Sequence, residues 1–151
     1  MIGWLLDTNV VSELSRPRPD ERVIGWLRDL PTDRTFVSVL TLAELDQGIE
    51  ALAPDDQRRP GLQRFRSRVE ARFAGRTLMM DDETVRLWGA ISGRYTRSLG
   101  GKAPIIDAML VASAQRRRLY IATRNVRDMR LLGGTPFNPW IDNPADFPLQ
   151  G

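Results

Sequence analysis

The sequence predicts an α/β protein, a three-layer sandwich in which a mostly parallel sheet of four to five strands is flanked by helices. Short apolar runs of strand length alternate along the 151 residues with longer segments whose apolar residues recur at helical spacing. Strands that alternate with helices form parallel sheets, and the carboxyl ends of all their strands meet at one edge. The length fits a single domain, residues 1–151, with an extended C-terminal tail from about residue 142.

The first predicted strand, residues 2–6, is apolar throughout, as is typical of a strand that is buried on both faces. Asp7 follows at its carboxyl end, which is where open α/β sheets bind ligands. A short helix is expected over residues 8–15. A second helix follows Asp20, and its apolar stripe consists of Val23, Trp26, Leu27 and Leu30.

The second predicted strand, residues 35–40, leads into a helix that begins at Thr41. Thr41 and Glu44 have the spacing of a capping box, which gives Glu44 a structural interpretation. A functional interpretation stays open beside it, because Glu44, like Asp7, lies just beyond the carboxyl end of a strand.

The alternation continues to the end of the chain. A helix over residues 62–73 precedes a short strand at 77–80, and three acids, Asp81 to Glu83, are assigned to capping the helix that runs to about Gly100. A helix from Pro104, a strand at 119–123, a short helix at 126–132 and a last strand at 137–141 follow.

Asp107 lies in the first turn of the helix from Pro104, which is otherwise almost entirely apolar to residue 114. Its helical neighbours are Leu110 and Val111, so we expect its carboxyl group to face a largely buried environment. A carboxylate in such a place must be protonated, paired or bound to a metal ion.

The composition restricts the chemistry. The chain has no Cys and no His, which excludes thiolate nucleophiles, zinc fingers and every triad that depends on imidazole. Catalysis must therefore come from carboxylates, hydroxyls, Lys or Arg, and we expect a hard metal ion that prefers oxygen ligands to assist it.

Positive charge is concentrated in the later part of the chain. Residues 61–133 carry 14 Arg and Lys102 against 6 acids, whereas residues 1–60 carry 7 Arg against 11 acids. This distribution suits contact with phosphates, and it equally suits solvated helix faces. The run Arg116 to Arg118 has the same two interpretations, since it ends a helix where cations complement the dipole.

The acids are expected to meet at one edge of the sheet. Asp7, Glu44 and the cluster Thr123-Arg124-Asn125 follow strands, and the first turn of the helix with Asp107 reaches the same edge if that helix lies across it. Clustered carboxylates repel one another unless a cation neutralises them. Oxygen ligands without His select Mg²⁺ or Mn²⁺, and such sites typically activate water for phosphodiester hydrolysis.

Four ordered motifs resemble those of PIN-domain ribonucleases, and more narrowly those of the VapC-type toxins. They are Leu5-Leu6-Asp7-Thr8-Asn9-Val10, Leu42-Ala43-Glu44-Leu45, Ile106-Asp107-Ala108-Met109-Leu110 and Ala122-Thr123-Arg124-Asn125. Phe137-Asn138-Pro139-Trp140 resembles the closing motif of the FitB-like subgroup. The resemblance implies an Mg²⁺- or Mn²⁺-dependent endoribonuclease, in which Asp7, Glu44 and Asp107 match the family's metal-binding acids and Asn9 and Thr123 the polar residues beside them.

One position departs from the pattern. Where many members have a fourth acid this chain has Asn125, and Asp128 is the nearest residue that supplies the missing charge. In the hypothesis that follows, Asn125 or Asp128 completes the site, and Arg124 and Arg127 hold the RNA backbone.

The resemblance also implies partners: a homodimer and a cognate VapB-like antitoxin, through which alone the complex contacts DNA. The chain has no membrane-length apolar run and no signal peptide, so a cytoplasmic location is expected. A receiver-like module is a rival, but Lys102, the sole Lys, lies in a Gly-rich loop and not at a strand end. The remaining alternative is a non-catalytic nucleic-acid-binding or adaptor domain with a PIN-like fold.

Overall fold

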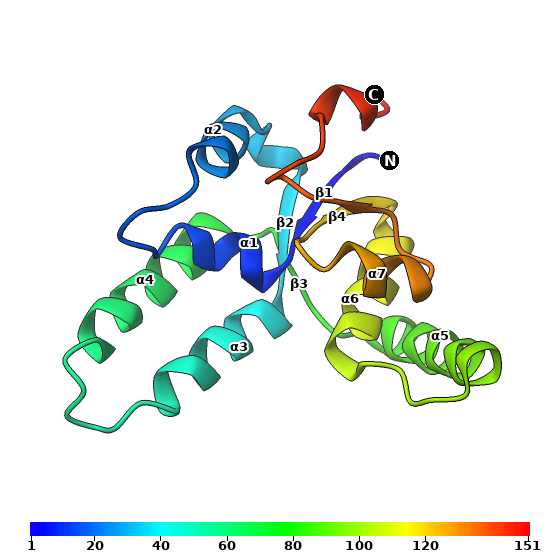
Figure 1. Ribbon diagram of the computed structural model, residues 1–151, viewed down its shortest axis with the longest axis horizontal. Helices are drawn as coiled ribbons and strands as arrows, with labels where there is room; N and C mark the ends of the chain where they lie inside the picture. Colours follow the sequence, from blue (N-terminus) through cyan, green and yellow to red (C-terminus); the bar gives the residue numbers. More distant parts are fainter.

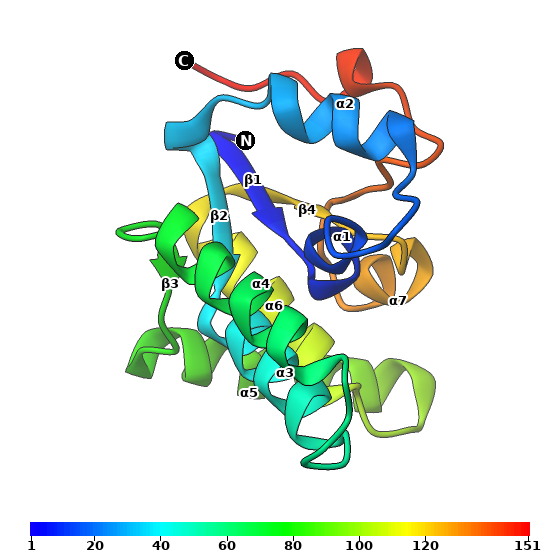
Figure 2. The ribbon, with the colours of Figure 1, turned by 90° about the vertical axis from the view of Figure 1, so that its left-hand side faces the viewer.

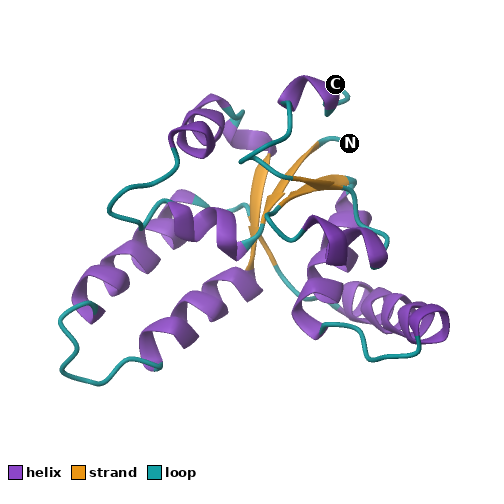
Figure 3. Ribbon diagram, viewed as in Figure 1, coloured by secondary structure: helices purple, strands orange, loops and turns teal.

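The computed structural model describes all residues, 1–151, and contains a five-stranded parallel sheet with the order β3-β2-β1-β4-β5. The strands are β1 (Gly3–Leu6), β2 (Thr35–Ser38), β3 (Thr77–Leu78), β4 (Leu119–Ala122) and β5 (Pro136–Phe137). Helices cover both faces of this sheet (Figure 1, Figure 3), which confirms the predicted three-layer α/β class.

Seven helices form the outer layers. Those that contribute to the core on one face are α1 (Thr8–Glu13), α2 (Glu21–Asp29), α3 (Val39–Glu50) and α4 (Arg59–Arg72); those on the other are α5 (Asp82–Leu99), α6 (Ile105–Arg117) and α7 (Val126–Leu131). The strand β1 serves both cores, because Trp4 and Leu6 pack with the first group and Leu5 with the second. Burial on both faces explains why the strand is apolar throughout.

The start of α3 differs from the expectation. The strand β2 ends at Ser38, whose hydroxyl caps α3 by accepting a hydrogen bond from the Leu40 N–H at 3.1 Å. Val39 and Leu40 are therefore helical, and Thr41 lies inside the first turn. The capping-box interpretation of Thr41 and Glu44 is wrong, since Glu44 lies in the second turn, beyond the amides that need a cap.

Three other boundaries also move. Helix α4 begins at Arg59, three residues earlier than expected, because Pro60 is favourable in a first turn. The strand β3 contains only Thr77 and Leu78. The strand β5 contains only Pro136 and Phe137, because the chain turns at Asn138.

Residues 142–151 pack back on the sheet, so they are not simply extended. They include a 3₁₀ turn at Pro144–Asp146, and Phe147 and Leu149 pack against the core cluster of Trp4. The Gln150 N–H donates to the Met1 carbonyl at 2.8 Å, and the two termini lie together at the start of β1 (Figure 2). None of the helices is both long and apolar enough to cross a membrane.

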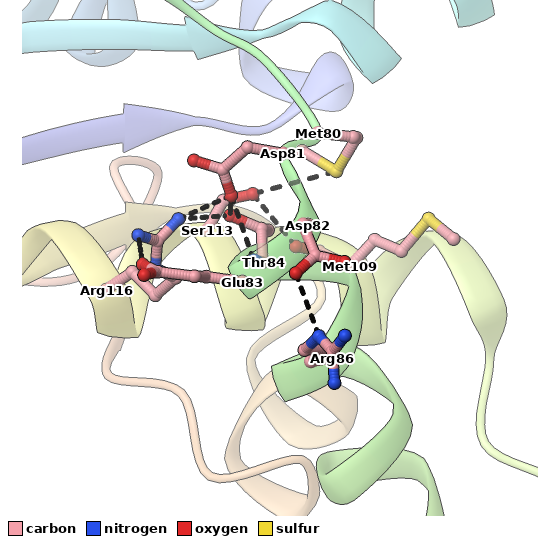
Figure 4. Close-up of polar contacts among 9 residues, drawn as sticks. All are labelled: Met80, Asp81, Asp82, Glu83, Thr84, Arg86, Met109, Ser113 and Arg116. Carbon is pink, nitrogen blue, oxygen red and sulfur yellow. Dashed lines mark hydrogen bonds and ion pairs between the residues drawn. The ribbon is translucent and has the colours of Figure 1, made fainter.

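The acids before α5 have the capping role that the sequence predicts. Asp81 is the N-cap and accepts hydrogen bonds from the amide and the hydroxyl of Thr84, at 2.9 and 2.6 Å. Arg116, from the last turn of α6, forms ion pairs with Asp81 and Glu83 (Figure 4). This arginine therefore joins two helices and is not available to bind phosphate.

Candidate active site

The register of the sheet brings three polar residues to one edge. Leu6, the last residue of β1, is paired with Val37 of β2 and with Ala122 of β4. The residues that follow, Asp7, Ser38 and Thr123, therefore lie side by side at the carboxyl ends of the three central strands.

Asp7 is held rigidly by three donors. It is 6% exposed and accepts hydrogen bonds from the Thr8 amide (2.7 Å), the Asn9 side-chain amide (2.8 Å) and the Thr123 hydroxyl (2.7 Å). Burial raises the pKa of Asp7, and the three hydrogen bonds offset part of this rise. Asn9 and Thr123 thus contact Asp7, as expected for the polar residues that accompany it.

Glu44 approaches the same edge from the second turn of α3. The Thr8 hydroxyl forms a hydrogen bond with its Oε2 and lies 3.3 Å from the hydroxyl of the buried Thr41. From the sequence Thr8 is expected only to start a helix, and its contact with Glu44 is a further role. The position of Thr8 directly after Asp7 is the only feature of the sequence that points to this contact, because consecutive residues beyond a strand end can contact different neighbouring elements.

Asp107 is half-buried, not largely buried as expected. The first turn of α6 extends beyond the sheet, and its two isoleucines, Ile105 and Ile106, are 59% and 37% exposed. The Asn125 side-chain amide donates to Asp107 Oδ2 at 3.0 Å.

Burial raises the pKa of Asp107 to about 6, together with the negative charges of Asp7, Asp128 and Glu44, while the hydrogen bond from Asn125 lowers it. Four acids, one directly after β1 and one each on α3, α6 and α7, therefore share one electrostatic environment.

Two residues share the place of the family's fourth acid. Asn125, the residue before α7, links the site because its backbone amide donates to the Thr123 hydroxyl (2.9 Å) and its side chain donates to Asp107. It is thus a neutral donor in this arrangement. Asp128, in the first turn of α7, is half-buried and adds the negative charge.

The side chains of the four acids are of the type that binds a hard cation. All four acids offer oxygen, which Mg²⁺ and Mn²⁺ prefer, and none of them forms an ion pair with an arginine or lysine. As they stand, no three acidic side chains are close enough together to enclose an ion. The residues therefore fit the chemistry of such an ion, and their carboxyl groups would have to move closer to hold it.

The two arginines assigned to the RNA backbone differ in their placement. The Arg124 backbone amide donates to Asn9 Oδ1 at 3.1 Å, and its guanidinium lies 4.0 Å from the centroid of the Trp140 ring. Arg127 is exposed, and no hydrogen bond or ion pair links it to the site.

Comparisons with known proteins identify the family of the chain. The family model described as the PIN domain matches residues 4–132. Toxin FitB of Neisseria gonorrhoeae is 33% identical over 138 residues, which cover 91% of this chain and 99% of FitB. VapC ribonuclease Y4jK of Sinorhizobium fredii is 30% identical, over 90% of this chain and 96% of the relative.

The fold is similar to solved structures as well. A chain in the structure of FitAB bound to an IR36 DNA fragment superposes with a TM-score of 0.82 at 31% identity, covering 93% of this chain and 97% of that one. With a model matched over most of its length and relatives aligned almost from end to end, the chain belongs to the PIN-domain family.

Proposed function

We propose that the protein is an Mg²⁺- or Mn²⁺-dependent endoribonuclease and the toxin of a VapBC-type toxin–antitoxin pair. The observation that carries the proposal is the group of four acids at one sheet edge, in which the charges of three raise the pKa of Asp107 and none has a basic partner. Proteins rarely keep such an arrangement for stability, because unpaired like charges destabilise the fold. The relatives named as ribonucleases support the same activity.

In this proposal Asp7 and Asp107 hold the ion, Glu44 holds it or orients the attacking water, and Asp128 adds charge. A bound Mg²⁺ or Mn²⁺ supplies an activated water and stabilises the leaving oxygen of the phosphodiester. Asn9 and Thr123 fix the Asp7 carboxylate, and Asn125 fixes that of Asp107. Thr8 orients Glu44 in the same way. These hydrogen bonds orient the carboxyl groups before an ion binds, and the movement that remains is the approach of the acids to one another.

The test is cleavage of a structured RNA by the purified chain with Mn²⁺ and with EDTA. We expect cleavage that needs Mn²⁺ and falls by at least about 100-fold in Asp7→Asn and Asp107→Asn proteins. The assignment is wrong if these variants cut as fast as the parent.

An antitoxin partner is part of the proposal. The solved relatives FitAB and the Salmonella typhimurium VapBC are complexes bound to DNA. In this chain a groove of about 210 Å³ between α1, α3 and α4 starts at Thr8 and Glu44 and continues over Leu45, Ile49 and Phe65. An apolar antitoxin segment in this groove would cover Glu44, and DNA would be contacted through the antitoxin. We extend the proposal to a homodimer of the chain.

Gly48 gives a direct test of the groove. It lines the groove and is exposed on α3, and a Cβ there meets nothing within 4 Å, so a side chain can leave the backbone at this position and Gly48→Trp places an indole at the groove. We expect antitoxin affinity to fall by at least about tenfold, measured by calorimetry, with an unchanged or higher Tm. Gly89→Trp on α5, equally free of neighbours, is the matched control and should bind as the parent does. Equal affinities of the Gly48 variant and the parent would rule out this groove.

A further inference from the structure

Arg124 forms no ion pair, although it lies beside the acidic site. Seven arginines form ion pairs, among them Arg59, Arg66 and Arg116. Arg124 forms none, although it follows Thr123 directly and its backbone amide is bonded to Asn9, which itself binds Asp7. A long, mobile cation beside four unpaired carboxylates would be expected to neutralise one of them.

The Trp140 indole holds the Arg124 guanidinium away from these carboxylates. The two groups are 4.0 Å apart in a cation–π contact, and Trp140 is itself half-buried against the core cluster of Trp4 and Trp26. An arginine that is stacked on a fixed aromatic ring loses much of its rotational freedom before any ligand binds.

A tight turn fixes Trp140. Asn138 is 8% exposed, and its side-chain oxygen accepts the Trp140 N–H at 3.0 Å. The Asn138 N–H donates to the Asp142 carboxylate at 2.7 Å, and its carbonyl accepts the Asp142 N–H at 2.8 Å. The turn follows β5, the neighbour of β4 in the sheet, so it places Trp140 beside the residues that follow β4.

We propose that Trp140 is a positioning residue: it holds the Arg124 guanidinium at the rim of the acidic site, apart from the carboxylates, where it binds a backbone phosphate of RNA. This inference rests on the proposed nuclease function. It explains two features together, a site whose acids stay free of internal cations and a nearby cation that stays free of internal acids. Because phosphate contacts carry no sequence information, the pair contributes affinity and not base specificity.

Binding of RNA without cleavage tests the proposal. The affinity of a fluorescein-labelled single-stranded RNA of mixed sequence is measured by anisotropy in EDTA over a series of salt concentrations. The proteins are the parent, Arg124→Ala, Trp140→Leu, the double variant and Trp140→Phe. Arg97→Ala on α5, which removes the same charge from an exposed and unpaired residue, is the control.

We expect Arg124→Ala to weaken binding about tenfold and to reduce the slope of log K against log salt by about one. Trp140→Leu should weaken binding about threefold and Trp140→Phe less than twofold, because a smaller ring retains part of the cation–π contact. The double variant should bind no more weakly than Arg124→Ala, and Arg97→Ala should bind as the parent does.

The double-mutant cycle of Arg124 and Trp140 distinguishes positioning of the guanidinium from simple loss of structure. A Trp140→Leu protein that loses affinity by the same factor with and without Arg124 would overturn the proposal, as would equal loss in Trp140→Phe and Trp140→Leu. If Trp140→Leu does not fold, Trp140→Phe and Arg124→Ala still decide, because a Trp140→Phe protein that binds as weakly as Arg124→Ala contradicts retention of the contact. Arg124-dependent binding without any Mn²⁺-dependent cleavage would remove the nuclease function and leave the RNA contact. Cleavage with binding that is insensitive to Arg124 would do the reverse.

Discussion

Two groups of acids lie near helix starts in this protein, and their surroundings are opposite. At the start of α5, Asp81 and Glu83 are paired with Arg116, and the hydrogen bonds from Thr84 and Arg116 hold the pKa of Asp81 well below its usual range (Figure 4). At the sheet edge, Asp7 and Asp107 have raised pKa values and no basic partner. The first arrangement stabilises the fold, whereas the second costs stability and leaves lone pairs for a ligand.

The largest expected contrast is in catalysis. Glu44→Gln removes a charge from the sheet edge, and Glu83→Gln removes the same charge from the pair with Arg116. We expect RNA cleavage to fall by at least about tenfold in the first and to stay unchanged in the second, measured as kcat/KM with Mn²⁺. Equal effects of the two substitutions would show that the sheet edge is not the site.

Much of this contrast was predictable from the residues around each acid. Asp81 precedes two further acids at an obvious helix start, and Asp7 ends a strand that is apolar throughout, so both positions followed from local pattern. The partners did not. The sequence does not show that Arg116 reaches Asp81 across 35 positions or that Thr8 turns to Glu44, because such contacts depend on helix packing.

The errors at Glu44 and Asp107 have similar causes. The capping-box spacing at Thr41 was real, but Ser38 had already capped the helix. The apolar character of α6 predicted a buried Asp107, and the position of its first turn beyond the sheet leaves it half-buried. Local patterns do not specify where an element ends relative to its neighbours.

A stability experiment should give opposite signs at the two groups. Because the pKa of Asp107 is raised to about 6, the native state retains a proton that the unfolded state has released. Stability therefore falls as pH rises from about 4 to about 6, and an Asn at this position avoids the loss. We expect Asp107→Asn to gain about 1 kcal/mol in free energy of unfolding over the parent at pH 7.5 in EDTA, measured in urea and taken relative to the difference between the two proteins at pH 4. The gain is smaller than the full pKa shift implies, because the carboxyl group is only half-buried.

Asp81 supplies the reverse case. Its pKa is lowered, so its contribution is present above the unfolded value of about 4 and is lost as pH falls below it. Asp81→Asn should therefore be less stable than the parent at pH 7.5 and approach it in acid. A shift of the same sign for Asp107→Asn and Asp81→Asn would contradict the distinction between the two groups.

The smallest expected effect concerns Asn125 and Asp128, which share the place of the fourth acid. Asn125→Asp replaces a donor to Asp107 with a further negative charge. We expect the metal-free protein to lose about 0.5–1 kcal/mol at pH 7.5 in urea unfolding, and Asp128→Asn to gain a similar amount. A stabilised Asn125→Asp protein would show that a carboxylate at position 125 is not repelled by Asp107.

The most direct test of the account is the effect of Mn²⁺ on thermal unfolding, because it needs neither an RNA substrate nor an antitoxin. At about 100 times the dissociation constant, binding to the native state alone adds about 2.7 kcal/mol, or roughly 5–10 °C in Tm for a chain of this length. We predict a shift of this size for the parent and for Asp81→Asn, and none for Asp7→Asn. An unchanged Tm of the parent in Mn²⁺ would contradict the metal site and favour a nucleic-acid-binding or adaptor domain without catalysis.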